Sequence, residues 1–257
     1  LNVNVRGDFH WARERWEEVK STSLTNASLS PTGQRALFEY RGEIFTAPKE
    51  KGDWRNITKN SGAADRSPVW SPDGKKIAWF SDASGEYQLM IGDQEGLEKP
   101  KAIVIEKPTF FFKPAWSPDA KYIAFSDTDY NLWFTDVNSG ITKKVDTDYY
   151  AHPNRTLNPV WSPDSKWIAY PRLLANHFKV IKAHNVETNQ SLQLTDGMAD
   201  AISPVWDANG KYLYFLASTN YALTSGWLDM SSYDRPLTRA LYLIVLSKDV
   251  AHCATQR

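Results

Sequence analysis

Cysteine is almost absent from this chain: Cys253 is the single one among 257 residues, which excludes a disulfide within the chain. An excess of either charge is also lacking, because 30 Lys and Arg residues balance 30 Asp and Glu residues. Since proteins bind nucleic acid largely by neutralising its phosphates, we expect no nucleic-acid partner. The longest apolar run, Ala240–Leu246, is far shorter than the roughly 20 residues of a membrane-spanning helix, so we expect no membrane partner either.

The motifs of common catalytic sites are missing as well. The chain contains no G-x-S-x-G, H-E-x-x-H, P-loop or G-x-G-x-x-G pattern. Its histidines are not grouped at the spacing of metal ligands and occur at His10, His152, His177, His184 and His252. We therefore expect no catalytic residue, no metal and no cofactor in this segment, although the sequence leaves open a Ser-His-Asp set assembled in space.

One acidic segment has the spacing that begins a calcium loop. Asp127, Asp129 and Asn131 follow the order D-x-D-x-N, but Leu132 stands where such a loop requires Gly. We interpret this segment as a solvated hairpin loop and not as a metal site.

The most informative feature of the chain is a repeat. Five times a short apolar strand enters a Ser-Pro-Asp-Gly-type turn and a second apolar strand leaves it, as in VWSPDGKKIAWFSD from Val69 to Asp82. The residue before each turn serves as a marker, and the markers are Leu29, Trp70, Trp116, Trp161 and Trp206. Their spacings of 41, 46, 45 and 45 residues predict a β-propeller with about four strands in each unit.

The repeat predicts an all-β fold of four-stranded blades over residues 24–249, in which the strand before each turn lies innermost. The expected blades are 24–66, 67–112, 113–157, 158–202 and 203–249. Residues 1–23 are expected to hold a trailing strand and a short linker helix at Trp11–Lys20, and 250–257 a polar tail. The five blades either belong to a larger ring or close on themselves.

The turns favour tight hairpins. Asp73 and Gly74 suit such a turn because Asp bonds its own backbone and Gly accepts a positive φ. Ala120 and Ser165 replace this Gly in the third and fourth repeats, so we expect the turn type to vary there.

The Ser-Pro-Asp-Gly turns are expected on one face of the propeller. The connections on the other face are long and unlike one another, which is typical of loops that carry function. Phe110, Phe111 and Phe112 are consecutive, so a strand would send Phe111 to the opposite side from its neighbours. Aromatic residues near Arg are typical of peptide-binding patches, although they equally fasten loops to neighbouring blades. The candidate substrate-binding residues are Arg66, Phe111, Tyr149, His152, Arg155, His177, Tyr221, Trp227, Tyr233 and Arg235.

Several stretches carry a family resemblance: RWEEVK, ASLSPTGQRALFEYRGEIFTAPKEKGDWRNIT, VWSPDGKKIAWFSDASGEYQL and YALTSGWLDMSSYDRPLTRALYLIVL. Together they resemble the propeller region of tricorn-type proteases over about 2–249. The resemblance implies the second, seven-bladed propeller, incomplete here, which guides oligopeptide substrates to a catalytic core. That core is a serine peptidase that follows a PDZ domain in a homo-oligomeric, cytoplasmic parent protein. No catalytic residue of the family maps onto this chain, so whether the segment is itself an enzyme stays open.

Two alternatives follow from the same repeat, because WSPDG also occurs in TolB-type WD40-like propellers and in prolyl-oligopeptidase-type propellers. A TolB-type chain would be a stand-alone propeller that binds a protein partner without peptidase activity. For a tricorn-type parent, the alternative location is periplasmic, since some bacterial relatives of that type carry export signals.

Overall fold

The computed structural model describes residues 6–10, 13, 18–60, 62–150, 157–220 and 237–246. Its strands form five antiparallel sheets, one for each sequence repeat. The first sheet contains β1 (Leu24–Leu29), β2 (Arg35–Tyr40), β3 (Glu43–Pro48) and β4 (Arg55–Asn56). The second contains β5 (Asp65–Trp70), β6 (Lys76–Ser81), β7 (Gln88–Asp93) and β8 (Lys101–Ile103). The third contains β9 (Phe111–Trp116), β10 (Tyr122–Asp127), β11 (Asn131–Asp136) and β12 (Thr142–Thr147).

The last two sheets continue the series. The fourth contains β13 (Val160–Trp161), β14 (Trp167–Leu173), β15 (Lys179–Asn185) and β16 (Gln190–Gln193). The fifth shows three strands among the described residues, β17 (Asp200–Trp206), β18 (Tyr212–Ser218) and β19 (Ala240–Val245). The all-β prediction of four-stranded blades is thus confirmed, and β5, β9 and β17 begin two or three residues before the expected blade starts.

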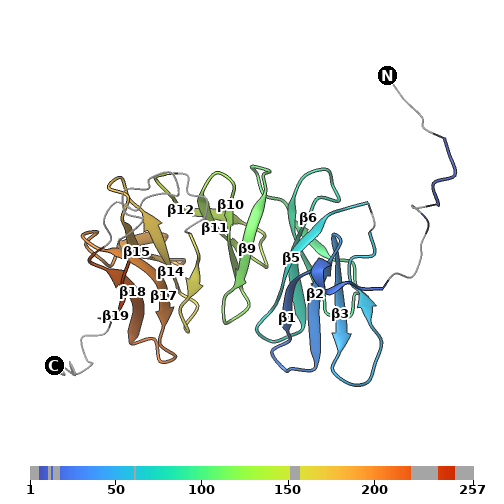
Figure 1. The fold of residues 1–257 in the computed structure, drawn as a ribbon, viewed down its shortest axis with the longest axis horizontal. Helices are drawn as coiled ribbons and strands as arrows, with labels where there is room; N and C mark the ends of the chain where they lie inside the picture. Colours follow the sequence, from blue (N-terminus) through green and yellow to red (C-terminus); the bar gives the residue numbers. More distant parts are fainter. Residues whose placement is uncertain are drawn as a thin grey trace.

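The sheets stand side by side in sequence order and form an open arc, from β1–β4 in blue to β17–β19 in orange (Figure 1). The first strand of each sheet is an edge strand and contacts the first strand of the next sheet, which makes it the innermost strand, as predicted. The first and last sheets lie at opposite ends of the arc, so the five blades do not close into a ring of their own.

The inner position of the first strand explains its prolines. Pro68, Pro114 and Pro204 each lie two residues before a marker tryptophan, inside β5, β9 and β17. Proline has no N–H to donate, so a sheet tolerates it on an edge strand. The registers of these three strands shift at the same place, beside a residue with positive φ, in the manner of a β-bulge.

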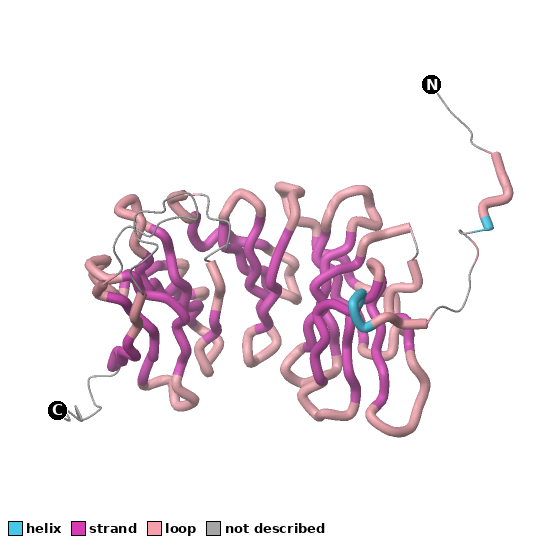
Figure 2. Tube along the Cα trace, in the orientation of Figure 1, coloured by secondary structure: helices cyan, strands magenta, loops and turns pink. Residues whose placement is uncertain are grey.

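The helical prediction at Trp11–Lys20 falls largely outside the described residues, and its described end, 18–20, is not helical. A short 3-10 turn, η2 (Ser21–Ser23), leads instead into β1 (Figure 2). No helix in the part of the chain that the structure describes is long and apolar enough to span a membrane.

Each Ser-Pro-Asp-Gly turn is closed by a small network of side-chain hydrogen bonds. Ser71 Oγ donates to Asp73 Oδ1 at 2.6 Å and accepts from the N–H of Lys76 at 2.9 Å. The N–H of Lys75 donates to the same carboxylate at 3.1 Å. The third and fourth repeats make the same bonds, so the recurring Ser and Asp have a structural role.

The expectation that the turn type varies is wrong. Ala120 and Ser165 have φ values of +59° and +61°, close to the +69° of Gly74. Both residues therefore adopt the left-handed conformation that the turn requires, at a steric cost that glycine avoids.

The marker tryptophans connect adjacent sheets. The Nε1 atom of Trp161 donates to the carbonyl oxygen of Ala115 at 2.9 Å, and that of Trp206 donates to the carbonyl of Val160 at 3.0 Å. Each acceptor is the residue directly before the preceding marker. Trp161 and Trp206 thus link neighbouring inner strands, whereas the buried Nε1 atoms of Trp70 and Trp116 have no hydrogen-bond partner.

Replacing Ala120 with Gly should raise the free energy of unfolding by up to about 1 kcal/mol, because it relieves a left-handed alanine. Ser165→Gly is the matched control, since it relieves the same strain but removes an oxygen that accepts the Asp119 N–H at 3.0 Å. Its gain should be smaller or absent. Chemical denaturation measures both, and a larger gain for Ser165→Gly would contradict this explanation.

Replacing Trp206 with Phe should lower the free energy of unfolding by about 1–3 kcal/mol, since the Val160 carbonyl loses its donor and the junction loses packed atoms. Trp116→Phe is the comparison, because the buried Nε1 of Trp116 has no hydrogen-bond partner. Equilibrium denaturation should show a smaller loss for Trp116→Phe. Equal losses would show that the hydrogen bond between sheets contributes nothing.

Candidate functional site

Antiparallel strands place successive connections at opposite ends of each sheet. The Ser-Pro-Asp-Gly turns lie at one end, which we call the turn face. The connections from second to third strands and from sheet to sheet lie at the other, the loop face, along the upper edge of Figure 1. The described parts of the loop face are 41–42, 57–60, 62–64, 82–87, 104–110, 128–130, 148–150, 157–159, 174–178, 194–199, 219–220 and 237–239.

Arg66 lies in a group of aromatic rings between the second and third sheets, which we call the Arg66 cluster. Its guanidinium carbon is 3.5 Å from the ring centre of Phe110 and 5.3 Å from that of Tyr87. Phe110 also contacts the rings of Tyr87 and Phe112, at 5.3 Å and 4.8 Å between centres. A guanidinium packed against an aromatic face is held in place for contact with a planar or polar group of a ligand.

Phe111 does not belong to the Arg66 cluster. It is 1% exposed and packs with Phe80 and Phe125 in the core between the second and third sheets. Its neighbours Phe110 and Phe112 lie on the other side of the strand, as the alternation of side chains requires. The structure therefore removes Phe111 from the candidate binding residues and adds its two neighbours.

A second aromatic group, which we call the Tyr150 cluster, joins the third and fourth sheets. The ring of His177 stacks on Tyr150 with 4.5 Å between centres and 8° between planes, and Tyr149 contacts the same ring edge-on at 4.7 Å. Tyr149 is 58% exposed, and the hydroxyl of Tyr150 donates to the carbonyl of Ala175 at 3.3 Å. Exposed aromatic rings held by neighbouring loops suit contact with a ligand better than they suit core packing.

An ionic network lies at the end of β12, a few residues before Tyr149 and Tyr150. Asp146 is bonded by the Tyr170 hydroxyl at 2.9 Å, by Lys182, and by Arg172 Nε at 3.0 Å. Burial alone would raise the pKa of Asp146, but the hydrogen bond from Lys182 and the charge of Arg172 outweigh it and lower that pKa. Asp148, two residues on, accepts the Leu173 N–H at 2.8 Å. The base of the loop that carries Tyr149 is therefore fixed to β14.

Six predicted site residues lie outside the described residues: His152, Arg155, Tyr221, Trp227, Tyr233 and Arg235. Of the four described ones, Tyr149 and His177 lie on the loop face, and Arg66 lies beside it at the start of β5, in a separate cluster. Tyr87 and Tyr150 complete these clusters and were not predicted. Tyr87 has no sequence signal, because its contact with Arg66 and Phe110 exists only once the second and third sheets are packed.

The Asp127 segment forms a hairpin, as predicted, with Asp129 exposed in its loop, but the first residue of the segment is buried. Asp127 is buried, and its carboxylate accepts hydrogen bonds from Asn131 N at 2.8 Å, Asn131 Nδ2 at 2.8 Å and Trp133 Nε1 at 2.7 Å. These bonds explain its spacing as the closure of the turn between β10 and β11. Among the described residues, no group of three or more potential metal ligands is present.

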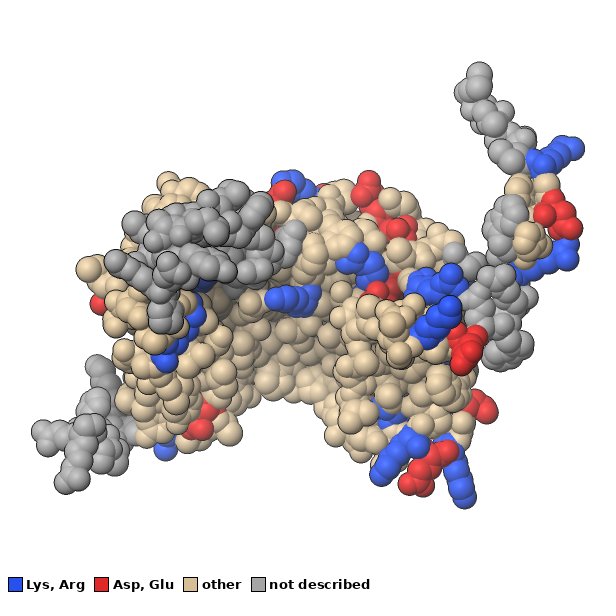
Figure 3. All heavy atoms as spheres, in the orientation of Figure 1, with Lys and Arg blue, Asp and Glu red and all other residues tan. Residues whose placement is uncertain are grey.

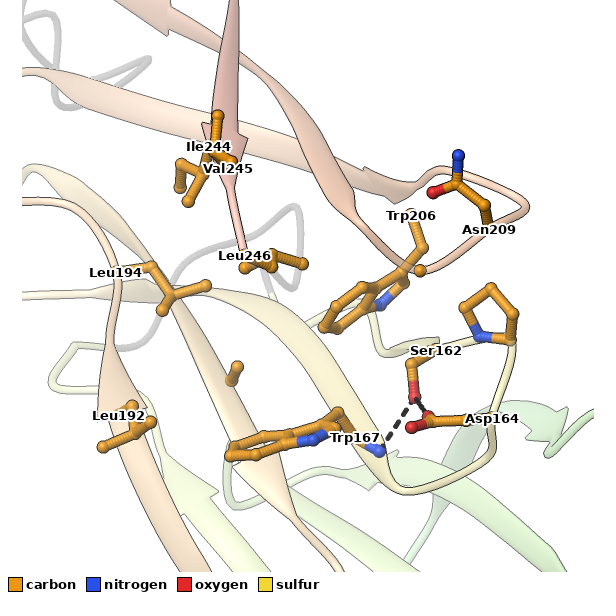
Figure 4. A pocket seen from close by; sticks show the side chains of 13 residues that line it. Ser162, Asp164, Trp167, Leu192, Leu194, Trp206, Asn209, Ile244, Val245 and Leu246 are labelled. Atoms are coloured by element: carbon orange, nitrogen blue, oxygen red, sulfur yellow. Dashed lines mark hydrogen bonds between the residues drawn. The ribbon is translucent and has the colours of Figure 1, made fainter. Parts of the chain in front are cut away.

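A cavity of about 720 Å³ lies between the fourth and fifth sheets at the turn face, a place that the sequence did not indicate. Trp167 and Trp206 approach it from the two sheets, and Leu194 and Ile244 lie along it (Figure 4). Its polar border is the Ser162–Asp164 turn, whose hydrogen bonds are already those of the repeat.

Charges are mixed over the visible face of the arc. Figure 3 shows the hollowed middle mostly free of charged side chains, with Lys, Arg, Asp and Glu intermixed around it. This agrees with the equal numbers of basic and acidic residues, and on this face no patch of one sign stands out among the described residues.

A comparison with known families finds that the model of the tricorn protease second β-propeller domain matches residues 24–257. Among curated proteins, the uncharacterised peptidase YuxL of Bacillus subtilis (strain 168) is 25% identical over 210 residues, 76% of this chain. That alignment covers 30% of YuxL, so this chain spans less than a third of that relative.

Two solved structures are similar in fold. The tricorn protease crystal structure is 16% identical with a TM-score of 0.63, covering 79% of this chain and 20% of that one. A protein described as TolB from Agrobacterium tumefaciens is 18% identical with a TM-score of 0.55, covering 87% of this chain and 77% of that one. Both support the propeller fold, and the match over residues 24–257 shows that this chain belongs to the family of the tricorn protease second β-propeller domain.

Proposed function

We propose that this chain is the propeller of a tricorn-type serine peptidase and that its loop face holds oligopeptide substrates for a catalytic core elsewhere in the parent protein. The observation that carries the proposal is the exposed Tyr150 cluster on the loop face of a member of this family. The similarity to the peptidase YuxL supports an association with proteolysis.

The chemistry of the two clusters suits peptides. Aromatic and Arg side chains supply much of the binding energy where proteins meet peptides or other proteins. The Tyr150 cluster is already held by the carbonyl of Ala175 and by the bond between Asp148 and Leu173 at the base of its loop, so little side-chain entropy is lost when a ligand binds. The Arg66 cluster adds a cation to the same face, one sheet junction away.

The remaining predicted residues belong to the same proposal. Segments 151–156 and 221–236 connect strands whose ends lie on the loop face, and they carry His152, Arg155, Tyr221, Trp227, Tyr233 and Arg235. The PDZ domain, the homo-oligomeric state and the cytoplasmic location of the parent are likewise proposed. The alternative location of the parent is periplasmic. The rival function is that of a stand-alone TolB-type propeller, which would bind a protein partner.

Replacing Tyr150 or His177 with Ala should weaken the binding of a fluorescently labelled pool of random oligopeptides. We expect a rise in Kd on the order of tenfold, the usual effect of removing an interface residue worth somewhat more than 1 kcal/mol. Fluorescence anisotropy measures the binding directly.

The matched control is Trp54→Ala. Trp54 is 64% exposed, but it lies in the connection between β3 and β4 at the turn face. Its removal should leave peptide affinity unchanged. Absence of peptide binding by the unaltered chain, or an equal loss in Trp54→Ala, would refute the proposed loop-face site.

A further inference from the structure

His184 is a buried histidine at the junction of the third and fourth sheets. It lies on β15, is 2% exposed, and its ring centre is 5.8 Å from that of Phe134 on β11. Its Nδ1 is 2.9 Å from Ser191 Oγ, whereas its Nε2 is buried and has no hydrogen-bond partner. A buried polar atom without a partner costs stability, so the residue needs an explanation.

The repeat shows that the fold does not need histidine at this position. His184 pairs across the sheet with Ile168, which follows its marker tryptophan by seven residues. The residues at the same place in the other four sheets are small or apolar, or carry one hydroxyl: Ala47, Gly92, Thr135 and Ile244. An ordinary blade therefore forms with a residue that carries no charge at any pH.

Charged groups face His184 from the strands around it. β12 contributes Lys143 and Asp146, β15 contributes Lys182, and β14 contributes Tyr170 and Arg172, which both bond Asp146. The pKa of Asp146 is lowered and burial raises that of Tyr170. His184 is therefore the group of this set whose ordinary pKa, about 6.5, lies closest to neutral pH.

Protonation of His184 is opposed by its surroundings. Burial lowers its pKa most, and Lys182 and Lys143 lower it further, whereas the charge of Asp146 and the side chain of Asn189 act in the opposite direction. A histidine with a lowered folded-state pKa stabilises the fold fully above its unfolded pKa of about 6.5 and loses that contribution as the pH falls.

We propose that the packing between the third and fourth sheets is sensitive to acid, because a second proton on the ring of His184 loosens it. The added charge would lie against Phe134 and beside Lys143 and Lys182, in a place with no partner for one ring nitrogen. The same junction fixes the loop of Tyr149 through Asp148 and Leu173, so acid would also release the Tyr150 cluster.

The first test compares the stability of the unaltered chain with His184→Gln and His184→Ile by chemical denaturation at about pH 7.5 and pH 5.5. Over this interval the folded-to-unfolded ratio of the unaltered chain should fall on the order of tenfold more than that of either variant. His10→Gln, at an exposed histidine, should keep the full pH effect. The same pH effect in both His184 variants as in the unaltered chain would overturn the proposal.

Two measurements on the unaltered chain guard against variants that fail to fold. An NMR titration should place the His184 midpoint below about 6.5, and a midpoint at or above that value would overturn the proposal. Hydrogen exchange, corrected for intrinsic rates, should accelerate at the acidic pH in β12, β14 and β15 more than in β6 and β7. Equal acceleration in all of these strands would show that the junction of the third and fourth sheets is not specially sensitive to acid, and would overturn the proposal. None of these results depends on peptide binding, so the proposed function is tested separately.

Discussion

Each sheet in this protein is apolar on both sides, so it is stable only when a neighbouring sheet covers each face. β6 shows the constraint plainly, because alternate residues serve different neighbours. Ile77 and Trp79 pack with Leu37 and Ile44 of the first sheet, whereas Phe80 packs with the third. The side-by-side arrangement of the sheets follows from this demand, and the arrangement in turn brings loops that are distant in sequence to one face.

The fifth sheet, at one end of the arc, shows the same need for a neighbouring sheet on each side. Leu241 on β19 is 68% exposed, and Leu243 two residues later is also exposed. On the covered side, Leu213 and Phe215 of the fifth sheet pack with Ala169 and Ile181 of the fourth. Among the described residues, then, an apolar side of the fifth sheet is covered where a neighbour lies against it and open where none does.

The features that depend on neighbouring residues in the sequence, such as the strands and the sides on which their residues lie, were predictable. The marker spacing gave five sheets, and the alternation of apolar residues placed Phe111 opposite Phe110 and Phe112. Features that depend on the distance between sheets were not predictable. The stacking of Arg66 on Phe110 and the bonds of Asp146 to Lys182 join residues from different repeats, and neither residue type signals its partner. Ala120 was misjudged for another reason: the hydrogen bonds around Ser117 hold the turn in one conformation whatever residue occupies that place.

The repeated residues serve the fold, and the unrepeated ones are the candidates for function. Ser, Asp and Trp recur at the turns and junctions, whereas Arg66, Tyr150, His177 and His184 each occur in a single repeat. The central claim is that this propeller serves a serine peptidase. The most direct test is the full reading frame on both sides of this segment, read together with the intact mass of the native polypeptide. We expect one polypeptide that also carries a PDZ domain and a serine peptidase core. A native polypeptide without a peptidase core would contradict it and favour the TolB-type alternative.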